Sequence, residues 1–199
     1  IPPDDRKTLV KAANTMSSVL ATPEEQDRCR SELFAYFREL AAERRRQPGD
    51  DVASILVSPN DNGEQLSDEE LDAYFLLLVI AGNETTRFLL AGGLEQLLLQ
   101  PEAMQRLRKE PSLIPSAVEE MIRWVTPVIH MRRTVTEDTQ AFGLDVAAGT
   151  KFVLYFSAAN RDPEVFESPH SFRVDRTPNK HVGFGAGHHF CMGAYLARL

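Results

Sequence analysis

Residues 184–193 read Phe-Gly-Ala-Gly-His-His-Phe-Cys-Met-Gly, and this stretch decides how the rest of the chain is interpreted. Its glycines permit positive φ angles and let the backbone approach a flat ligand closely. Cys191 stands where residues 192–199 predict the start of a helix. The free N–H groups at a helix N-terminus stabilise a thiolate and tune a metal bound to it. The stretch is therefore a candidate site for a metal held by a thiolate.

Two other interpretations of the same stretch stay open at this point. One is a glycine-rich turn around a buried cysteine, which is the usual environment of an isolated cysteine. The other is a zinc site, and its candidate ligands are His181, His188, His189 and Cys191. Zinc prefers ligands that come in spaced pairs, and the sequence has no second Cys or His pair elsewhere.

Composition places the chain among ordinary globular proteins. Its 199 residues are 43% hydrophobic and 26% charged, which suits one domain with a hydrophobic core. The net charge of −7 argues against nucleic acid as a partner, because phosphate binding needs a basic surface. The two cysteines, Cys29 and Cys191, do not make a disulfide framework, so we expect a cytoplasmic location. We expect no membrane span, because the longest apolar run, residues 74–82, is far shorter than the ~20 residues required.

The first half of the sequence predicts helices. Thr22, followed by a proline and two glutamates, is typical of a capped helix start, and this helix is expected to run to about Arg46. A capping box at Ser67 begins the longest helix, which we expect to reach about Gln100. The middle of that helix is apolar on nearly all sides, so we expect it to be buried all round. Shorter helices are expected over about residues 3–16, 52–57, 101–109 and 113–124.

The pattern changes after Pro127. Residues 128–136, 140–147 and 151–156 are rich in β-forming side chains and are separated by turns that contain glycine. Residues 160–180 contain several prolines and little periodicity, which predicts a long irregular segment of the packed or functional kind. The expected fold class is therefore mainly α with a small β portion.

Three further motifs accompany the glycine-rich stretch. Residues 81–86, inside the long helix, read Ala-Gly-Asn-Glu-Thr-Thr, and residues 120–123 read Glu-Met-Ile-Arg. Residues 160–163 read Asn-Arg-Asp-Pro, and Phe172 with Arg176 follows in a Phe-x-x-x-Arg pattern. The glycine-rich stretch has the form Phe-Gly-x-Gly-x-His-x-Cys-x-Gly. In this order and spacing, the motifs show that the chain resembles soluble bacterial cytochromes P450 over essentially its whole length.

The resemblance implies a partial cytochrome P450 fold over residues 1–199, from about the family's F helix to the helix after the cysteine. The N-terminal part of the family domain and its C-terminal β segment are expected to lie outside this sequence. We therefore expect the segment alone to bind haem poorly and to be inactive.

The cofactor that the resemblance implies is haem b, iron protoporphyrin IX, with Cys191 as the iron ligand. The resemblance also implies that His189 and Arg133 bind the haem propionates. Arg132 is an open alternative to Arg133, because the register is uncertain by one residue. The remaining residues expected to line the haem are Phe184, Gly185, Gly193 and Ala81.

Glu84 and Thr85 match the family's acid–alcohol pair, which implies that they deliver protons during the activation of O2. A threonine inside a helix can instead bond back to a carbonyl one turn earlier. Gly82 weakens the same turn, so we expect the helix to bulge and to open a groove on this face.

Glu120 and Arg123 are three residues apart and so share one helix face. As an exposed pair they would add almost nothing to stability. The resemblance implies instead a buried structural pair that ties its helix to the irregular segment through Arg176.

The activity that the resemblance implies is that of a haem-thiolate monooxygenase, which inserts one oxygen atom from O2 into a hydrophobic small molecule such as a sterol, terpene or lipid. The implied electron source is a ferredoxin-type donor with its reductase. A P450-like peroxygenase or decarboxylase and a non-catalytic haem-binding protein are the alternatives, and the presence of Thr85 argues against both. The residues expected to face the substrate are Val79, Gly82, Val128 and Ile129.

Overall fold

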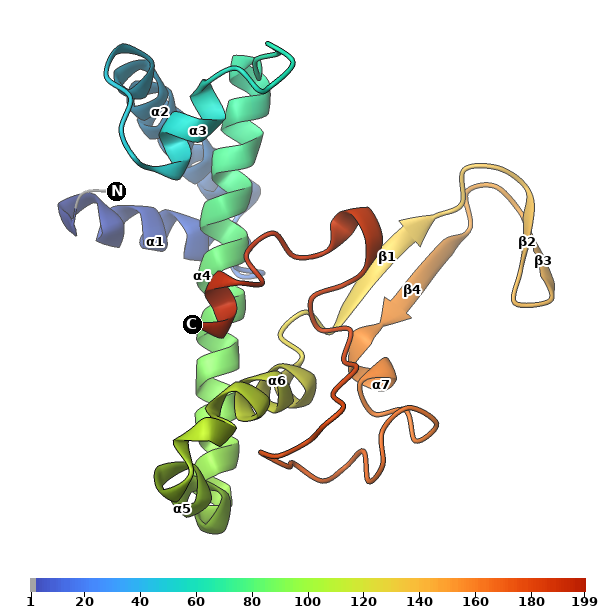
Figure 1. Ribbon diagram of the computed structural model, residues 1–199. Coiled ribbons are helices and arrows are strands. Elements are labelled where there is room, and N and C mark those ends of the chain that lie inside the picture. Colours follow the sequence, from blue (N-terminus) through green and yellow to red (C-terminus); the bar gives the residue numbers. More distant parts are fainter. Residues whose placement is uncertain (1–2) are drawn as a thin grey trace. The chain divides into compact units, whose positions relative to one another are not determined.

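The computed structural model describes residues 3–199, which form two compact units (Figure 1). One unit contains the residues up to Glu84, and the other runs from Thr85 to Leu199. The helix α4 (Asp68–Leu99) contributes residues to both. The chain is mainly helical with a few short strands, which confirms the expected fold class.

The elements follow the sequence prediction closely, because most of their signals are local. The helices of the first unit and the shared helix are α1 (Pro3–Ser17), α2 (Pro23–Arg46), α3 (Val52–Val57) and α4. The helical elements of the second unit are α5 (Pro101–Lys109), η1 (Pro111–Leu113), α6 (Ile114–Val125), α7 (Phe156–Ala159), η2 (Gly187–His189) and η3 (Leu196–Arg198). The strands are β1 (His130–Thr134), β2 (Thr139–Ala141), β3 (Leu144–Val146) and β4 (Lys151–Tyr155).

Reciprocal capping boxes begin the two longest helices, as the sequence predicts. At α2, the Glu25 N–H donates to Thr22 Oγ1 at 3.2 Å, and the Thr22 N–H donates to Glu25 Oε2 at 2.8 Å. At α4, Ser67 and Glu70 repeat the arrangement at 3.2 Å and 2.8 Å. Each box satisfies two N–H groups that a helix start would otherwise leave without partners.

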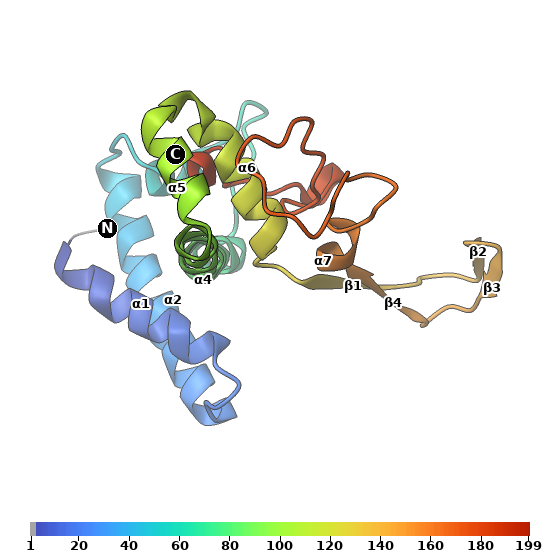
Figure 2. The same ribbon diagram turned by 90° about the horizontal axis from the view of Figure 1, so that it is seen from below.

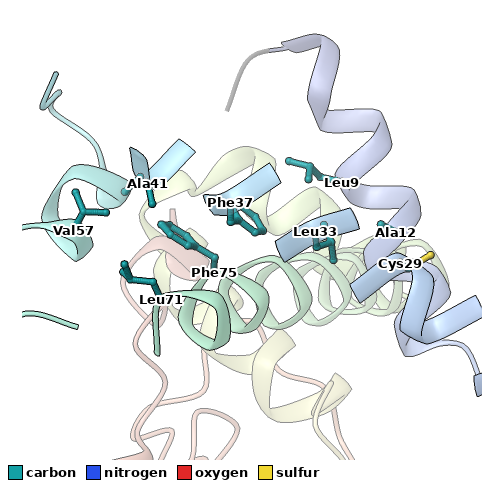
Figure 3. Packing of buried hydrophobic residues seen from close by; sticks show 10 residues of the cluster. Leu9, Ala12, Cys29, Leu33, Phe37, Ala41, Val57, Leu71 and Phe75 are labelled. Carbon is teal, nitrogen blue, oxygen red and sulfur yellow. The ribbon is translucent and has the colours of Figure 1, made fainter. Parts of the chain in front are cut away.

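The core of the first unit is a hydrophobic cluster between α1, α2, α3 and the first part of α4 (Figure 3). At its centre the rings of Phe37 and Phe75 stack with centroids 4.8 Å apart and planes 11° apart. Both side chains are buried, and Leu33 of α2 and Leu71 of α4 lie in the same cluster. The apolar face that the sequence predicts on α2 is therefore the face that packs.

The second unit combines helices, a nested pair of hairpins and the irregular C-terminal segment (Figure 2). Strands β1 and β4 pair antiparallel, with Arg132 opposite Val153, and the small antiparallel β2–β3 pair lies between them in the chain. A hydrophobic cluster joins α4, α6 and the irregular segment, and the ring of Trp124 packs edge-on against Phe172 at 5.8 Å. The irregular segment is thus packed against the helices.

The prediction that α4 is buried on all sides is wrong. Leu77, Leu90 and Leu98 are 54%, 61% and 65% exposed. The described elements cover Leu71, Phe75 and Leu97 of α4 but leave these leucines exposed, so an apolar sequence alone did not determine how much of the helix is covered. The bulge predicted at Gly82 is also not present, since α4 runs through residues 81–86 without interruption. One glycine costs a helix only about 1 kcal/mol, which the rest of a long helix easily offsets.

By length and composition, α4 is the one helix in residues 3–199 that could cross a membrane. However, its middle contains Asn83, Glu84, Thr85, Thr86 and Arg87. Charged side chains at the centre of a bilayer are costly, so this polar turn argues against a membrane span.

Candidate functional site at the Cys191 loop

The helix α6 carries a fully buried ion pair. Arg123 donates from Nε to Glu120 Oε2 at 2.7 Å and from Nη2 to Glu120 Oε1 at 2.8 Å, and both side chains are 0% exposed. The same guanidinium donates to the carbonyls of Asn160, Pro169 and Ser171 at 2.8, 2.9 and 3.1 Å. Buried charges need such complete pairing, because each unpaired one would cost several kcal/mol. Arg123 therefore fixes three points of the irregular segment to α6.

A second buried arginine, Arg176, reaches the same carboxylate. Its Nε donates to Glu120 Oε2 at 2.9 Å, and its Nη1 donates to the carbonyl of Glu167 at 2.7 Å. The N–H of Arg173 also donates to Glu120 Oε1 at 2.8 Å, and Asn179 Nδ2 donates to Oε2 at 3.2 Å. The structure thus brings Glu120, Arg123 and Arg176 together. The sequence did not predict the bonds from Arg173 and Asn179, since a backbone N–H and a single side-chain amide carry no recognisable pattern.

Asn160 connects the end of α6 to the start of the cysteine loop. Its Nδ2 donates to Thr126 Oγ1 at 2.9 Å, while its Oδ1 accepts the Val182 N–H at 2.8 Å. Thr126 is the left-handed residue that ends α6, with φ 44°, and its hydroxyl donates to the Arg123 carbonyl at 2.7 Å. Asn160 and Thr126 are 0% exposed. The motif at residues 160–163 therefore has a structural role that its sequence did not reveal.

The loop that carries Cys191 is shaped by two glycines with positive φ. Gly185 and Gly187 have φ angles of 73° and 65°, which side-chain-bearing residues rarely adopt. The Gly185 N–H donates to the Val182 carbonyl, and the Cys191 N–H donates to the Phe184 carbonyl, both at 2.8 Å. The loop thus turns back on itself and presents Cys191 as a half-buried thiol without a disulfide partner.

The residues after Cys191 do not form the α-helix that the sequence predicts. Residues 192–195 are turns, and η3 is a short 3₁₀ helix. A segment of this length is too short to be a stable α-helix without further packing. The expected stabilisation of a Cys191 thiolate by a helix N-terminus is therefore not supported.

Glu119, the residue before Glu120, binds both flanks of the Cys191 loop. His181 Nε2 lies 2.9 Å from Glu119 Oε2, and Arg198 donates from Nε to Glu119 Oε1 at 2.5 Å and from Nη2 to Oε2 at 3.1 Å. Because His181 Nδ1 accepts the Gly183 N–H at 3.2 Å, the ring proton lies on Nε2 and is donated to Glu119. The sequence offered no signal for this cluster beyond His181 as a possible zinc ligand.

Burial and pairing shift the pKa values in this cluster. Burial lowers the pKa of His181 below that of an ordinary imidazole, although Glu119 acts in the opposite direction. Burial raises the pKa of Glu119, but the hydrogen bonds from Arg198 and His181 outweigh it, and the net shift is downward. The cluster at neutral pH is therefore a neutral imidazole, a carboxylate and a guanidinium.

The other expected haem-binding residues lie on separate elements. His189 belongs to the exposed turn η2, and Arg132 and Arg133 are exposed residues of β1. Neighbouring side chains on a strand point to opposite faces, so only one of the two arginines can face a given ligand. Gly193 follows the thiol closely, because a Cβ placed there would lie 3.9 Å from Cys191 Sγ.

The expected catalytic and substrate-facing residues are distributed over α4 and the segment before β1. Glu84 and Thr85 are consecutive, partly buried residues of α4, and Ala81 and Gly82 are exposed on the turn before them. Val79 is partly buried against the first unit's hydrophobic cluster, which reduces the surface that it can offer to a substrate. The apolar side chains next to β1 are Val128, partly buried, and Ile129, 58% exposed.

Cys191 can supply one ligand to a metal, so the residues present fit a metal whose other ligands belong to a cofactor. Among residues 3–199, no three His, Cys, Asp or Glu side chains are grouped as a metal site. His181, a ligand in the zinc interpretation, uses both ring nitrogens for Glu119 and Gly183. A single thiolate on a glycine-rich loop suits haem, because the porphyrin supplies its own nitrogens to the iron.

Comparison with known proteins finds bacterial monooxygenases and hydroxylases among the relatives of this chain. Steroid C26-monooxygenase of Mycobacterium tuberculosis is 42% identical over 205 residues, which cover 100% of this chain and 55% of that protein. Methyl-branched lipid omega-hydroxylase of Mycobacterium bovis is 45% identical over 84% of this chain and 40% of its own length. The chain thus spans about half the length of the curated relatives that it matches.

Solved structures agree with the sequence relatives. CYP109E1 of Bacillus megaterium, in complex with corticosterone, matches with a TM-score of 0.91 and 38% identity over 100% of this chain and 55% of that one. The cytochrome P450 PksS of Bacillus subtilis matches with a TM-score of 0.94 and 38% identity, over 100% of this chain and 52% of that one. The family model for cytochrome P450 matches residues 16–199. The chain belongs to the cytochrome P450 family.

Proposed function

We propose that residues 1–199 are the haem-thiolate part of a cytochrome P450 monooxygenase, an oxidoreductase that inserts one atom of O2 into a hydrophobic small molecule. The observation that carries the proposal is the attachment of the Cys191 loop to α6. The buried Glu120–Arg123–Arg176 cluster and Asn160 hold the segment that leads into the loop. A buried network of charges and hydrogen bonds is expected where one side chain, here that of Cys191, must be held accurately.

The side chain that would bind the iron of haem b is Cys191, as a thiolate. The glycines at 185 and 193 would let the backbone approach the flat macrocycle, with Phe184 and Ala81 as further contacts. His189 and one of the neighbouring residues Arg132 and Arg133 would neutralise the propionates. When bound, haem supplies the redox chemistry that activates O2.

Thr85 and Glu84 would deliver protons during the activation of O2. The hydroxyl of Thr85 can accept and donate a hydrogen bond at the same time, so it can hold a proton donor in place next to the reacting oxygen. The carboxyl group of Glu84, the preceding residue of α4, would take up protons from the solvent and pass them on toward Thr85. Both side chains are partly buried, so they are shielded from solvent without being isolated from it.

The substrate class that we propose is a steroid, terpene or branched lipid. Relatives named for steroid and methyl-branched lipid oxidation, and related structures that hold corticosterone or testosterone, support this class. The side chains of Val79, Val128 and Ile129 are apolar and Gly82 is small, which suits such a molecule. A ferredoxin with its reductase would supply the electrons, in the cytoplasm.

The test uses the holoprotein expressed from its complete gene. Testosterone and a methyl-branched fatty acid are titrated against the ferric protein, and the expected result is a spin-state change in the Soret region followed by hydroxylated product. Thr85→Ala should lower the product formed per O2 consumed by at least about tenfold, as loss of a proton-transfer group does. Thr86→Ala, on the next residue of the same helix, is the matched control and should keep the wild-type ratio. Absence of a spin change and of product with every apolar ligand would overturn the proposal.

A further inference from the structure

A single carboxylate binds residues on both sides of Cys191. Glu119 accepts from His181, which lies before the loop, and from Arg198, which lies after it. Neither contact belongs to the Glu120–Arg123–Arg176 cluster, which binds the segment before His181. The segment from His181 to Arg198 is therefore closed by Glu119 into a loop with Cys191 inside it.

We propose that Glu119 is a positioning residue for Cys191, which holds His181 and Arg198 together and so fixes the thiolate and balances the charge beside it. The inference rests on the proposed function, because it gives Glu119 a role toward the iron ligand. It concerns a residue that touches neither the cofactor nor the substrate in the proposed function.

A chain of contacts leads from Glu119 to Cys191 on the C-terminal side of the loop. The Arg198 guanidinium, held by two hydrogen bonds to Glu119, lies over the Phe184 ring at 4.6 Å. The carbonyl of Phe184 accepts the Cys191 N–H at 2.8 Å. A displacement of Arg198 is therefore passed through Phe184 to the backbone of Cys191.

On the N-terminal side of the loop, Glu119 binds His181. His181 is almost fully buried, with a side chain 4% exposed, and its Nδ1 accepts the Gly183 N–H. Gly183 fits tightly against α6, since a Cβ placed there would lie 2.7 Å from Ile122 Cγ2. The bond from His181 to Glu119 therefore fixes the loop two residues before Gly183, where it packs closely on the helix.

The charges of Glu119 and Arg198 should affect the reduction potential of the iron, which a purely structural role would leave unchanged. The hydrogen bond with Glu119 raises the pKa of Arg198, and the negative charge of Cys191 acts in the same direction. Glu119 thus partly neutralises a guanidinium whose charge interacts with that of Cys191. Without Glu119, the uncompensated cation would favour the reduced, more negative iron centre; without Arg198, the uncompensated carboxylate would disfavour it.

The experiment measures the ferric–ferrous reduction potential and the spontaneous conversion of the reduced carbon monoxide complex from the band at about 450 nm to the band at about 420 nm. Both use the holoprotein from the complete gene. Glu119→Gln should raise the potential and Arg198→Gln should lower it, and the double variant should return toward the wild-type value. Each single variant should speed the conversion by about tenfold, since charge-assisted hydrogen bonds are lost. Glu119→Asp, which keeps the charge, should restore most of the wild-type potential.

The matched controls are Glu102→Gln and Arg108→Gln, which make the same changes at exposed positions of α5 and should leave both readouts unchanged. If Glu119→Gln takes up no haem, Arg198→Gln and Arg198→Lys decide, because only the first removes the cation. Potentials that do not move, or that move in the same direction for Glu119→Gln and Arg198→Gln, would overturn the inference. A wild-type protein without the band at about 450 nm would overturn the proposed function instead.

Discussion

The Arg123 guanidinium and the Glu120 carboxylate form a two-point hydrogen-bonded ion pair with no exposure to solvent, at 2.7 and 2.8 Å. The pair has no access to water, so its stability depends on the protein partners around it. Those partners come from the irregular segment, which makes the pair the joint between α6 and the part of the chain that leads to Cys191.

Arg123→Lys should therefore be strongly destabilising although it keeps the positive charge. An ammonium group cannot reproduce the two parallel bonds to Glu120 together with the bonds to three carbonyls. We expect a loss of about 3–5 kcal/mol in the free energy of unfolding, as for other broken buried ion pairs, and a loss of bound haem. Urea unfolding and the ratio of haem to protein provide the measurement. Arg108→Lys on the exposed surface of α5 is the control, and an equal effect of both changes would contradict this account.

Two glycines allow a test of the packing between the cysteine loop and α6. Gly183→Ala should cost about 1–3 kcal/mol, because its Cβ would lie 2.7 Å from Ile122 Cγ2 and the loop would have to move. Gly82→Ala should be neutral or stabilising by up to about 1 kcal/mol, because it is a helical residue whose added Cβ meets nothing within 4 Å. Urea unfolding of the two variants measures the difference. Similar values for both would show that the loop is not held against α6 as described.

The cluster around Glu119 predicts how stability depends on pH. The pKa of His181 is lower in the folded protein than its ordinary value of 6.5, so the unfolded chain takes up this proton first as the pH falls. Stability is therefore fully present above about pH 6.5 and decreases below it. The pKa of Glu119 is also lowered, so a second loss should begin as the pH approaches 4.5, its ordinary value.

His181→Asn should remove the first of these two losses, since it leaves no titrating ring between Glu119 and Gly183. His170→Asn, at an exposed position, is the control and should leave the pH profile as it is. Unfolding free energies measured from about pH 8 down to about pH 4 provide the test. A wild-type stability that rises as the pH falls from 7 to 6 would contradict the burial-driven shift of His181.

The features that the sequence predicted well depend on local signals. Thr22 and Ser67 cap their helices, and Gly185 and Gly187 adopt positive φ, because each of these outcomes is decided within a few residues. The prediction that α4 would be buried all round failed at Leu77, in its apolar middle, because coverage depends on which elements pack nearby.

The cluster around Glu119 could not be predicted from the sequence for a different reason. His181 and Arg198 are separated from Glu119 by 62 and 79 positions in the chain. No spacing rule links such positions, and an acidic residue next to Glu120 has no distinguishing pattern of its own. Only the folded arrangement of α6 and the loop brings these side chains together.

The central claim is that Cys191 is the thiolate ligand of a haem iron, and the carbon monoxide difference spectrum of the reduced protein tests it most directly. The complete gene is expressed as the wild type, as Cys191→Ser and as Cys29→Ser, the last being a control at a buried cysteine of the first unit. Thiolate ligation predicts a Soret band at about 450 nm for the wild type and for Cys29→Ser, and its loss in Cys191→Ser. A wild-type band at about 420 nm, or a band at about 450 nm that survives Cys191→Ser, would contradict the claim.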